Sequence, residues 1–305
     1  MLGRNIISIA DLSPIELKQV LDVSTWMKNN RTTPVLQGKT LALVFEKPSL
    51  RTRVSFEVAM QRLGGNTISL PSSEIQMGNR EPVKDVARVL ARMVDVIAAR
   101  THEHSTITTL GEYSSVPVIN ALSDIEHPCQ SLADLLTLKE HFGDLKGIKI
   151  AYIGEGNNVA RSLAYASVMA GIDLTIACPE NYRLPEETIV SIQNLEGNGS
   201  VSQTDDPRLA ISDAAAVYTD VWASMGYEHE LELRRNIFKP YQLNNELLSF
   251  APNDILIMHD LPAHRGDEIT EEIIESDYSI VFDQAENRMH AQQGLLALIL
   301  SDSKF

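Results

Sequence analysis

The chain has 305 residues, 44% of them hydrophobic and 22% charged, which is ordinary for a globular protein with one large or two medium domains. Its formal net charge of -15 argues against a general nucleic-acid-binding protein, because such a protein needs a basic face. No apolar run approaches the roughly 20 residues of a membrane span, and the two cysteines lack metal-binding or redox spacing, so a cytoplasmic protein is predicted.

Short apolar runs alternate with amphipathic helical patterns along the chain. Most of the runs are continuously apolar, which is typical of parallel strands that are buried on both faces. Strands are predicted at residues 40–45, 66–70, 96–99, 116–120, 149–153, 174–177, 214–219, 255–259 and 279–282. Helices are predicted, among other places, at 82–92, 131–141 and 285–300. This alternation predicts an α/β fold, and a glycine-containing segment at 142–147 predicts the boundary between two halves of similar size.

Four polar side chains stand where a helix would begin after the strand at 40–45. They are Ser49, Arg51, Thr52 and Arg53. Free N–H groups and the positive end of the helix dipole favour an anion there, and the guanidinium fork matches phosphate oxygens. The alternative is that Ser49 only caps the helix and the arginines are solvated.

His127 and Gln130 lie at the predicted start of a later helix. Pro128 is well suited to the first turn, and the spacing of three residues lets both side chains face one target. An imidazole there can donate to a carbonyl oxygen, although His127 alternatively only caps the helix. Cys129 has no activating neighbour and is predicted to be packed rather than nucleophilic.

A glycine-rich turn follows the strand at 149–153. Gly154 and Gly156 suggest a dinucleotide fingerprint, but the next small residue comes one position late, so a different ligand is favoured. Asn157 and Asn158 would lie at the carboxyl edge of the sheet, where their amides suit a zwitterionic amino acid.

Two later loops place charged groups after predicted strands. Asp220 pairs with a substrate ammonium or belongs to an ordinary turn. The loop 259–268 is dense in histidine and carboxylate, but it lacks a helical His-x-x-x-His pair and Pro262 disrupts regular geometry, so a charged substrate loop is favoured over a metal site. Spacing does not decide whether Arg288 reaches the site or makes only a surface pair.

Seven segments, taken together and in a single order, resemble the aspartate/ornithine carbamoyltransferase family. The segments are residues 45–53, 76–84, 127–130, 154–158, 220–226, 259–268 and 286–288. The resemblance implies transfer of a carbamoyl group from carbamoyl phosphate to the δ-amine of L-ornithine, giving L-citrulline and phosphate. It implies no covalent intermediate, metal or other cofactor, and the nicotinamide interpretation of the glycine-rich turn is set aside.

The resemblance also implies two doubly wound parallel-sheet domains. A carbamoyl-phosphate-binding domain at 1–145 would be joined by the C-terminal helix, 285–305, and an ornithine-binding domain would occupy 146–284. Family members are homotrimers with sites between subunits. A homotrimer, or an assembly of trimers, is therefore expected, with Gln76 reaching a neighbour's substrate and with no nucleic-acid or membrane partner.

Individual site residues follow from the same resemblance. Those implied to bind carbamoyl phosphate are Ser49, Leu50, Arg51, Thr52, Gln76, Arg100, His127, Gln130, Asp260, Leu261 and Arg288. Those implied to bind ornithine are Asn158, Asp220, Ser224 and Met225. Arg51 and His127 would act in catalysis together with Asp260, by stabilising charge on the phosphate and polarising the carbonyl group.

Asp260 departs from the family pattern, in which this loop position is usually a cysteine assigned the proton-accepting role. An ionised carboxylate only accepts hydrogen bonds and carries a negative charge, unlike a thiol. Three hypotheses follow: Asp260 is a general base, it marks a different acceptor such as N-acylornithine or putrescine, or it impairs the enzyme. A homologue that binds carbamoyl phosphate without turnover is the remaining alternative.

Overall fold

The computed structural model describes residues 1–30, 32–71, 75, 77–78, 80–223 and 228–303. These residues divide into two compact units, one formed by Met1–Leu136 with Glu286–Phe305 and the other by Thr137–Ala285. The chain passes between the units inside two helices, α6 (Pro128–Phe142) and α13 (Val281–Leu300). The domain limits at 145 and 285 stay predictions.

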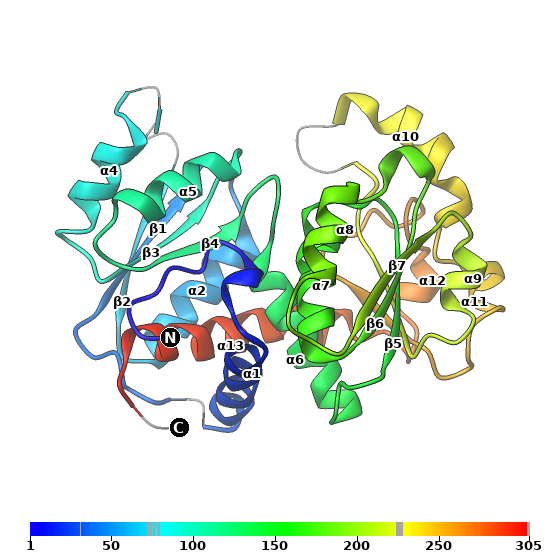
Figure 1. Cartoon of the computed structure of the whole chain (residues 1–305), viewed down its shortest axis with the longest axis horizontal. Coiled ribbons are helices and arrows are strands. Elements are labelled where there is room, and N and C mark those ends of the chain that lie inside the picture. The colour runs from blue at the N-terminus through cyan, green and yellow to red at the C-terminus, as the bar shows by residue number, and fades with distance from the viewer. Residues whose placement is uncertain (31, 72–74, 76, 79, 224–227, 304–305) are drawn as a thin grey trace. The chain divides into compact units, whose positions relative to one another are not determined.

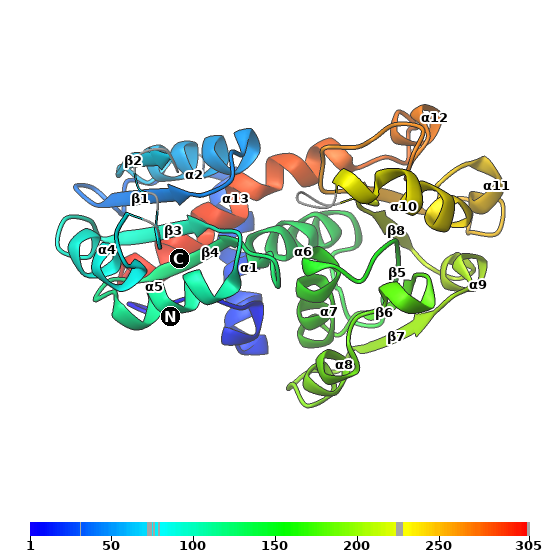
Figure 2. The same cartoon turned by 90° about the horizontal axis from the view of Figure 1, so that it is seen from above.

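Unit 1 is built on a four-stranded parallel sheet with the order β2-β1-β3-β4 (Figure 1). Its strands are β1 (Thr40–Phe45), β2 (Asn66–Pro71), β3 (Val96–Arg100) and β4 (Val118–Leu122). Its complete helices are α1 (Pro14–Asn29), α2 (Leu50–Arg62), α4 (Val83–Leu90), α5 (His104–Tyr113) and the short η1 (Ile9–Asp11). Helices α4 and α5 pack side by side (Figure 2).

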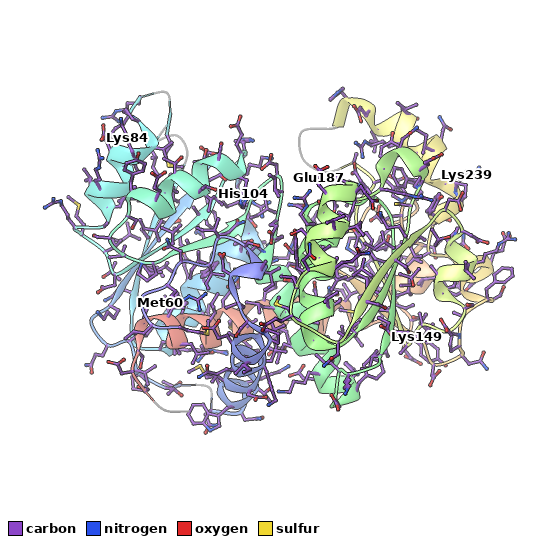
Figure 3. The ribbon with its side chains drawn as sticks, viewed as in Figure 1. Met60, Lys84, His104, Lys149, Glu187 and Lys239 are labelled. Carbon is purple, nitrogen blue, oxygen red and sulfur yellow. The ribbon has the colours of Figure 1, made fainter. Side chains whose placement is uncertain are left out.

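The central strands of this sheet are buried because their residues are apolar on both faces. Every residue of β3 is buried, and in β1 only Thr40 is partly exposed. Met60 on α2 has no exposed surface and contributes to the interior of unit 1 (Figure 3). Strand β2 is the partly exposed edge of the sheet.

Unit 2 has a five-stranded parallel sheet with the order β7-β6-β5-β8-β9. Its strands are β5 (Lys149–Ile153), β6 (Asp173–Ala177), β7 (Ser200–Thr204), β8 (Ala216–Thr219) and β9 (Leu256–His259). Its helices are α7 (Asn158–Ala170), α8 (Glu186–Gln193), α9 (Pro207–Ile211), α10 (Leu231–Phe238), α11 (Asn245–Leu248) and α12 (Glu271–Ile274), with short turns η2 (Glu180–Tyr182), η3 (Glu228–Glu230) and η4 (Lys239–Tyr241). Lys149, labelled in Figure 3, opens the central strand.

The predicted fold class is confirmed: both units are α/β with parallel sheets, and the end of the C-terminal helix belongs to unit 1. The strand predicted at 279–282 is wrong, because α13 already begins at Val281 and only Ser279 makes a bridge, to Ile257 in β9. A short apolar run does not distinguish a strand from a buried helix start. Strand β7 was missed because its polar residues carry little strand signal at the sheet edge.

Candidate functional site

In both units several candidate residues follow the strands at which the strand order reverses. The chain runs from β1 to one side of the first sheet and then crosses to β3, and it runs from β5 through β6 and β7 before crossing to β8. The loops that follow these paired strands diverge there, so open parallel sheets bind ligands at this point. The topology therefore places the loops after β1 and β3 together in unit 1, and those after β5 and β8 together in unit 2.

The start of α2 is organised by Ser49. Its hydroxyl accepts a hydrogen bond from the Thr52 N–H at 3.3 Å and donates to Thr52 Oγ1 at 2.9 Å. Ser49 is thus the N-cap, as the sequence suggested. The N–H groups of the first turn point out of the N-terminus of the helix, which is the positive end of its dipole. Leu50 is 78% exposed, and Arg53 pairs with Glu57 at the surface, so Arg53 is not part of the buried cluster.

A buried arginine connects this helix start to the start of α6. Arg288, on α13, donates to Thr52 Oγ1 at 2.9 Å and to Gln130 Oε1 at 2.6 Å. Gln130 in turn donates to Asp134 Oδ1 at 2.8 Å. The structure therefore brings three segments far apart in the sequence into one network, and it decides that Arg288 points into unit 1 rather than to a surface partner.

His127 completes this network as a neutral group. It is buried at the start of α6, and Arg100 is buried at the end of β3. Burial, followed by the charges of Arg288 and Arg100, lowers the pKa of His127 well below its ordinary value. A neutral imidazole has one donating and one accepting nitrogen, so His127 can donate to a carbonyl oxygen without adding another charge.

Asn157 and Asn158, the two asparagines of the glycine-rich turn, have different roles. Asn157 is the N-cap of α7, and its Oδ1 accepts from the N–H groups of Val159 and Ala160 at 3.0 Å each. Its amide nitrogen donates to Asp220 Oδ2 at 2.7 Å. Asn158 opens the helix and is half-buried. Asn157 thus orients Asp220, while Asn158 keeps its predicted place at the carboxyl edge of the sheet.

Packing explains the second glycine of this turn. A Cβ atom at Gly156 would lie 2.4 Å from the backbone nitrogen of Leu184 and 2.8 Å from the carbonyl carbon of Arg183. The Gly156 N–H also donates to the Tyr182 carbonyl at 2.7 Å. Close approach of two backbone segments therefore accounts for this glycine without a dinucleotide.

Unit 2 contains a cluster of carboxyl groups around one histidine. Side-chain donor atoms of Asp220, His259 and Asp260 all lie within 4.8 Å of one another. The Nε2 atom of His259 lies 3.0 Å from Glu268 Oε1, and its Nδ1 atom lies 3.5 Å from Asp260 Oδ1. The His259 N–H donates to Gln284 Oε1 at 2.9 Å, which anchors the end of β9. Four ionisable groups thus share a largely buried site.

The protonation of this cluster follows from burial and mutual charge. Burial and then the charge of Asp260 raise the pKa of Asp220 well above its ordinary value. Burial opposes protonation of His259, but hydrogen bonds to Asp260 and Glu268 and the charges of Asp260 and Asp220 outweigh it and raise the pKa of His259 to about 9.

The geometry at Nδ1 of His259 describes its neutral form. The Leu261 N–H donates to this atom at 2.9 Å, so Nδ1 carries no proton and Nε2 donates to Glu268. A proton added at Nδ1 would give up that bond and face Asp260 instead. The imidazole thus has two hydrogen-bonding states that differ by one proton, with Asp260 on one side and Glu268 on the other.

A metal ion would fit this cluster poorly. Besides the bond from Leu261 to His259, Asp220 accepts from Asn157 and from the Val221 N–H. Two of the three potential ligands therefore already have donors at the atoms that a cation would need. The prediction that no metal is required stays a prediction.

The remaining predicted residues are placed as follows. Arg51 is half-buried in the first turn of α2. Leu261 has φ 59°, in the left-handed region that is costly for a branched side chain, and lies in the loop after β9. Gln76, Ser224 and Met225 lie outside the described residues.

Arg234, on α10, is a well-placed residue that the sequence did not single out. Its guanidinium donates to Glu155 Oε2 at 2.6 Å, to the Trp222 carbonyl at 2.9 Å and to Glu230 Oε2 at 2.9 Å. It also lies 5.1 Å from the centre of the Tyr182 ring. Arg234 therefore holds residues on both sides of 224–227 and ties them to the glycine-rich turn. The only sequence signal, Glu230 four residues before Arg234, is typical of an ordinary surface pair.

The two cysteines are packed. Burial raises the pKa of Cys129 to about 12, and burial likewise raises the pKa of Cys178 to about 12. Neither is a thiolate at neutral pH. This agrees with the interpretation of Cys129 as a core residue.

Comparison with known proteins gives a family for the whole chain. Residues 4–140 match the model described as "Aspartate/ornithine carbamoyltransferase, carbamoyl-P binding domain", and residues 146–299 match "Aspartate/ornithine carbamoyltransferase, Asp/Orn binding domain". Among curated relatives, the ornithine carbamoyltransferase of Pyrococcus abyssi is 48% identical, over 99% of this chain and 97% of its own. The protein of Pyrococcus furiosus named "Ornithine carbamoyltransferase, anabolic" is 47% identical, over 99% and 98%.

Solved structures agree. Ornithine carbamoyltransferase from Pyrococcus furiosus superposes with a TM-score of 0.95, at 47% identity and with 99% of each chain covered. A structure of N-acetyl-L-ornithine transcarbamylase also superposes, with a TM-score of 0.88, at 30% identity and with 97% of this chain and 100% of that chain covered.

Proposed function

Because this chain belongs to the aspartate/ornithine carbamoyltransferase family, we infer that it transfers the carbamoyl group of carbamoyl phosphate to the δ-amine of L-ornithine, giving L-citrulline and phosphate. The relatives that match it over almost their whole length, at 47–48% identity, are named for this activity. The N-acetylornithine enzyme is a more distant relative, at 30% identity. The amine attacks directly, so no covalent intermediate is formed.

Unit 1 binds carbamoyl phosphate in this proposal. Arg51, Arg100 and the N-terminus of α2 neutralise the phosphate, and they stabilise the charge that develops on it as the bond to the carbamoyl group breaks. Thr52 and Arg288 bind the carbonyl oxygen. The hydrogen bond between these two residues supports this assignment, because it fixes both donors before substrate arrives.

His127 and Gln130 complete the carbamoyl site. The neutral state of His127 supports its role as a hydrogen-bond donor to the carbonyl oxygen. Gln130 is held by Arg288 and Asp134 and binds the carbamoyl amide. Ser49 and Leu50 line the start of α2 and place its N–H groups. Leu261 contributes to the carbamoyl end of the site.

Unit 2 binds ornithine. Asp220 pairs with the α-ammonium group, and its fixed hydrogen bond with Asn157 supports that role. Asn158 binds the α-carboxylate together with Ser224 and Met225. The observation that carries the function is the presence of a cationic cluster in unit 1 and of a carboxylate cluster in unit 2, one for an anionic donor and one for a diamino acid.

Asp260 accepts the proton of the attacking amine. A lysine-like amine has a pKa of about 10.4 and must lose a proton before it attacks, so a nearby base is required. The contact of Asp260 with His259, which in turn contacts Glu268, supports this role because it positions the carboxylate and offers a path for the proton. The proton then leaves with the product phosphate.

The acceptor amine is tested with a panel of substrates. Carbamoyl phosphate is offered with ornithine, N-acetylornithine, N-succinylornithine, putrescine and aspartate, and the ureido products are measured. We expect citrulline from ornithine and at most trace product from the other four amines. Absence of citrulline together with another ureido product would reject ornithine as the acceptor.

A second candidate function is a carbamoyl-phosphate-binding homologue without turnover. The observation that favours it is Asp260, which stands where the family usually has cysteine. Calorimetry that detects carbamoyl-phosphate binding in a protein that converts none of the five amines would support this candidate.

We also propose that the chain forms a homotrimer, with Gln76 reaching a neighbour's substrate, and that it acts in the cytoplasm in arginine biosynthesis. The naming of the Pyrococcus furiosus relative as anabolic supports the direction. Light scattering coupled to size-exclusion chromatography measures the molar mass of the assembly, and the mass of a monomer would reject the proposed homotrimer. In the described part of the chain, none of the helices combines the length and hydrophobicity that a membrane crossing demands.

A further inference from the structure

We propose that Asp220 and Asp260 share a single proton in the substrate-free protein, and that this carboxyl pair replaces the thiol-carboxylate arrangement of other family members as the proton-handling group of the acceptor site. The proposal rests on the proposed function for its consequence in catalysis. The shared proton itself is a property of the free protein and is measured without turnover.

The proximity of the two carboxyl groups favours a proton on the pair. Asp220 is 7% exposed, and its carboxyl group lies in one cluster with that of Asp260, in which the side-chain donor atoms are within 4.8 Å of one another. Two ionised carboxylates repel each other and can only accept hydrogen bonds, whereas a proton on one of them relieves the repulsion and supplies a donor. Asp220 also accepts from Asn157 Nδ2 at 2.7 Å, which holds it in this orientation.

The surroundings keep the total charge of the pair low. Tyr152 from β5 and Glu155 from the following turn face the site, and His259 and Glu268 face it from β9 and its loop. Glu268 is fully buried and Glu155 is already paired with Arg234, so neither relieves the negative charge. A protonated His259 offsets only one of the three carboxylates around it, those of Asp220, Asp260 and Glu268. Asp220 and Asp260 therefore retain a proton between them, as in other carboxyl pairs that share a site.

Ornithine changes this balance. Its α-ammonium group pairs with Asp220, which favours the ionised carboxylate and releases the shared proton to solvent. Asp260 is then free to accept the proton of the δ-ammonium group, which leaves the neutral amine that attacks. The productive free enzyme for ornithine is accordingly the form in which both carboxyls are ionised, and acid reduces its population.

Infrared difference spectroscopy tests the shared proton directly. The spectrum of the free wild-type protein at neutral pH, minus that of Asp260→Asn, should show the carbonyl band of one protonated carboxyl group. Asp220→Asn should remove the same band. Glu126→Gln is the matched control, because Glu126 is buried but accepts from Ser8 Oγ at 2.6 Å and the Ile9 N–H at 3.1 Å, and its replacement should leave the band in place.

The pH dependence of kcat/KM for ornithine gives a second readout, in wild type and Asp260→Cys. In Asp260→Cys a neutral thiol replaces the like charge beside Asp220, so the pKa of Asp220 falls. The acid limb of the pH profile then moves to lower pH. The ratio of wild-type to variant kcat/KM should fall about tenfold for each unit of that shift on the acid side. The titration of ornithine itself is common to both proteins and cancels in the ratio.

Two results would overturn the proposal. One is the absence of the carboxylic acid band in wild type, or its persistence in both Asp220→Asn and Asp260→Asn when circular dichroism shows these variants folded. The other is tight binding of Zn²⁺ by wild type that Asp260→Asn abolishes, which would make the cluster a metal site. A protein that shows the band but makes no citrulline would retain the shared proton and lose the proposed function instead.

Discussion

The two units place opposite charges at equivalent positions of similar sheets. In unit 1, Arg100 and Arg288 gather around a histidine, and in unit 2, Asp220 and Asp260 gather beside one. Each cluster disfavours the charged state of one titratable group: burial and neighbouring like charge lower the pKa of His127 and raise the pKa of Asp220. Burial and like charge act in both units, and only the sign differs.

The comparison teaches how one topology serves two ligands. The strand order reverses within the sheet of either unit, and the side chains at the strand ends there decide whether the site suits an anion or a diamino acid. Unit 1 keeps its charges on long arginines whose forks reach several partners. Unit 2 keeps them on short carboxylates, which need precise backbone placement from β8 and β9.

The largest effect is expected at Asp260, in the anionic cluster. Asp260→Asn removes the proposed proton acceptor but keeps the shape of the side chain, so kcat should fall by about 10²–10⁴-fold with little change in the KM for ornithine. Steady-state kinetics at saturating carbamoyl phosphate measures this. Asp260→Cys should recover part of the loss, and an unchanged kcat in Asp260→Asn would remove Asp260 from the mechanism.

Breaking the cationic cluster should have the next largest effect. Arg288→Met removes the donor to Thr52 and Gln130, and kcat/KM for carbamoyl phosphate should fall by about 10²–10³-fold. Arg288→Lys keeps the charge but loses the planar guanidinium, so its kcat/KM for carbamoyl phosphate should lie between the values of wild type and Arg288→Met. The control is Arg53→Met, on the exposed side of α2, for which a loss comparable to that of Arg288→Met would contradict the assignment.

A smaller and more selective effect is expected at Arg234. Arg234→Gln releases Trp222 and Glu230, which flank in sequence the residues proposed to bind ornithine, so the KM for ornithine should rise by about tenfold while the KM for carbamoyl phosphate is unchanged. Arg234→Lys should recover part of the affinity.

The neighbouring Arg235 supplies the matched control for this prediction. It lies on the same helix but pairs with Asp267 and Glu232 and is more exposed. Arg235→Gln should leave both KM values near wild type. Equal changes in both KM values for Arg234→Gln would indicate general destabilisation rather than positioning of the ornithine segment.

The smallest expected effect is on the pH dependence of the unfolding free energy. The pKa of His127 is lowered in the folded protein, so the unfolded chain binds more protons below its ordinary pKa of about 6.5, and acid destabilises the fold. Between pH 7.5 and 5.5, wild type should lose about 1 kcal/mol more unfolding free energy than His127→Gln. Urea denaturation at the two pH values measures the difference, and equal losses would show that His127 is not held neutral.

Much of the fold was predictable because its signals are local. The apolar runs at 40–45 and 149–153 coincide with β1 and β5, and the polar turns after them mark the loops of both sites. The strand prediction at 279–282 was wrong because a short apolar run suits either a strand or a helix. The residues that extend α13 back to Val281 lie downstream of this run.

The sequence predicted which residues form the candidate site, but not which of them are hydrogen-bonded to each other. Spacing left open whether Arg288 reached the site, and the structure joins it to Thr52 and Gln130. The hydrogen bond from Asn157 to Asp220 and the anchor at Arg234 were not predicted, because each depends on a partner far away in the sequence.

The sequence by itself determined the family, the α/β class and the presence of Asp260 where a thiol is usual, since motifs and periodicity are properties of neighbouring residues. Only the tertiary structure decided what Asp260 faces. Strand order brings the ends of β8 and β9 together, so Asp220 and Asp260 meet although 40 positions separate them. A pKa depends on burial and on charges across space, and neither can be read from spacing along the chain.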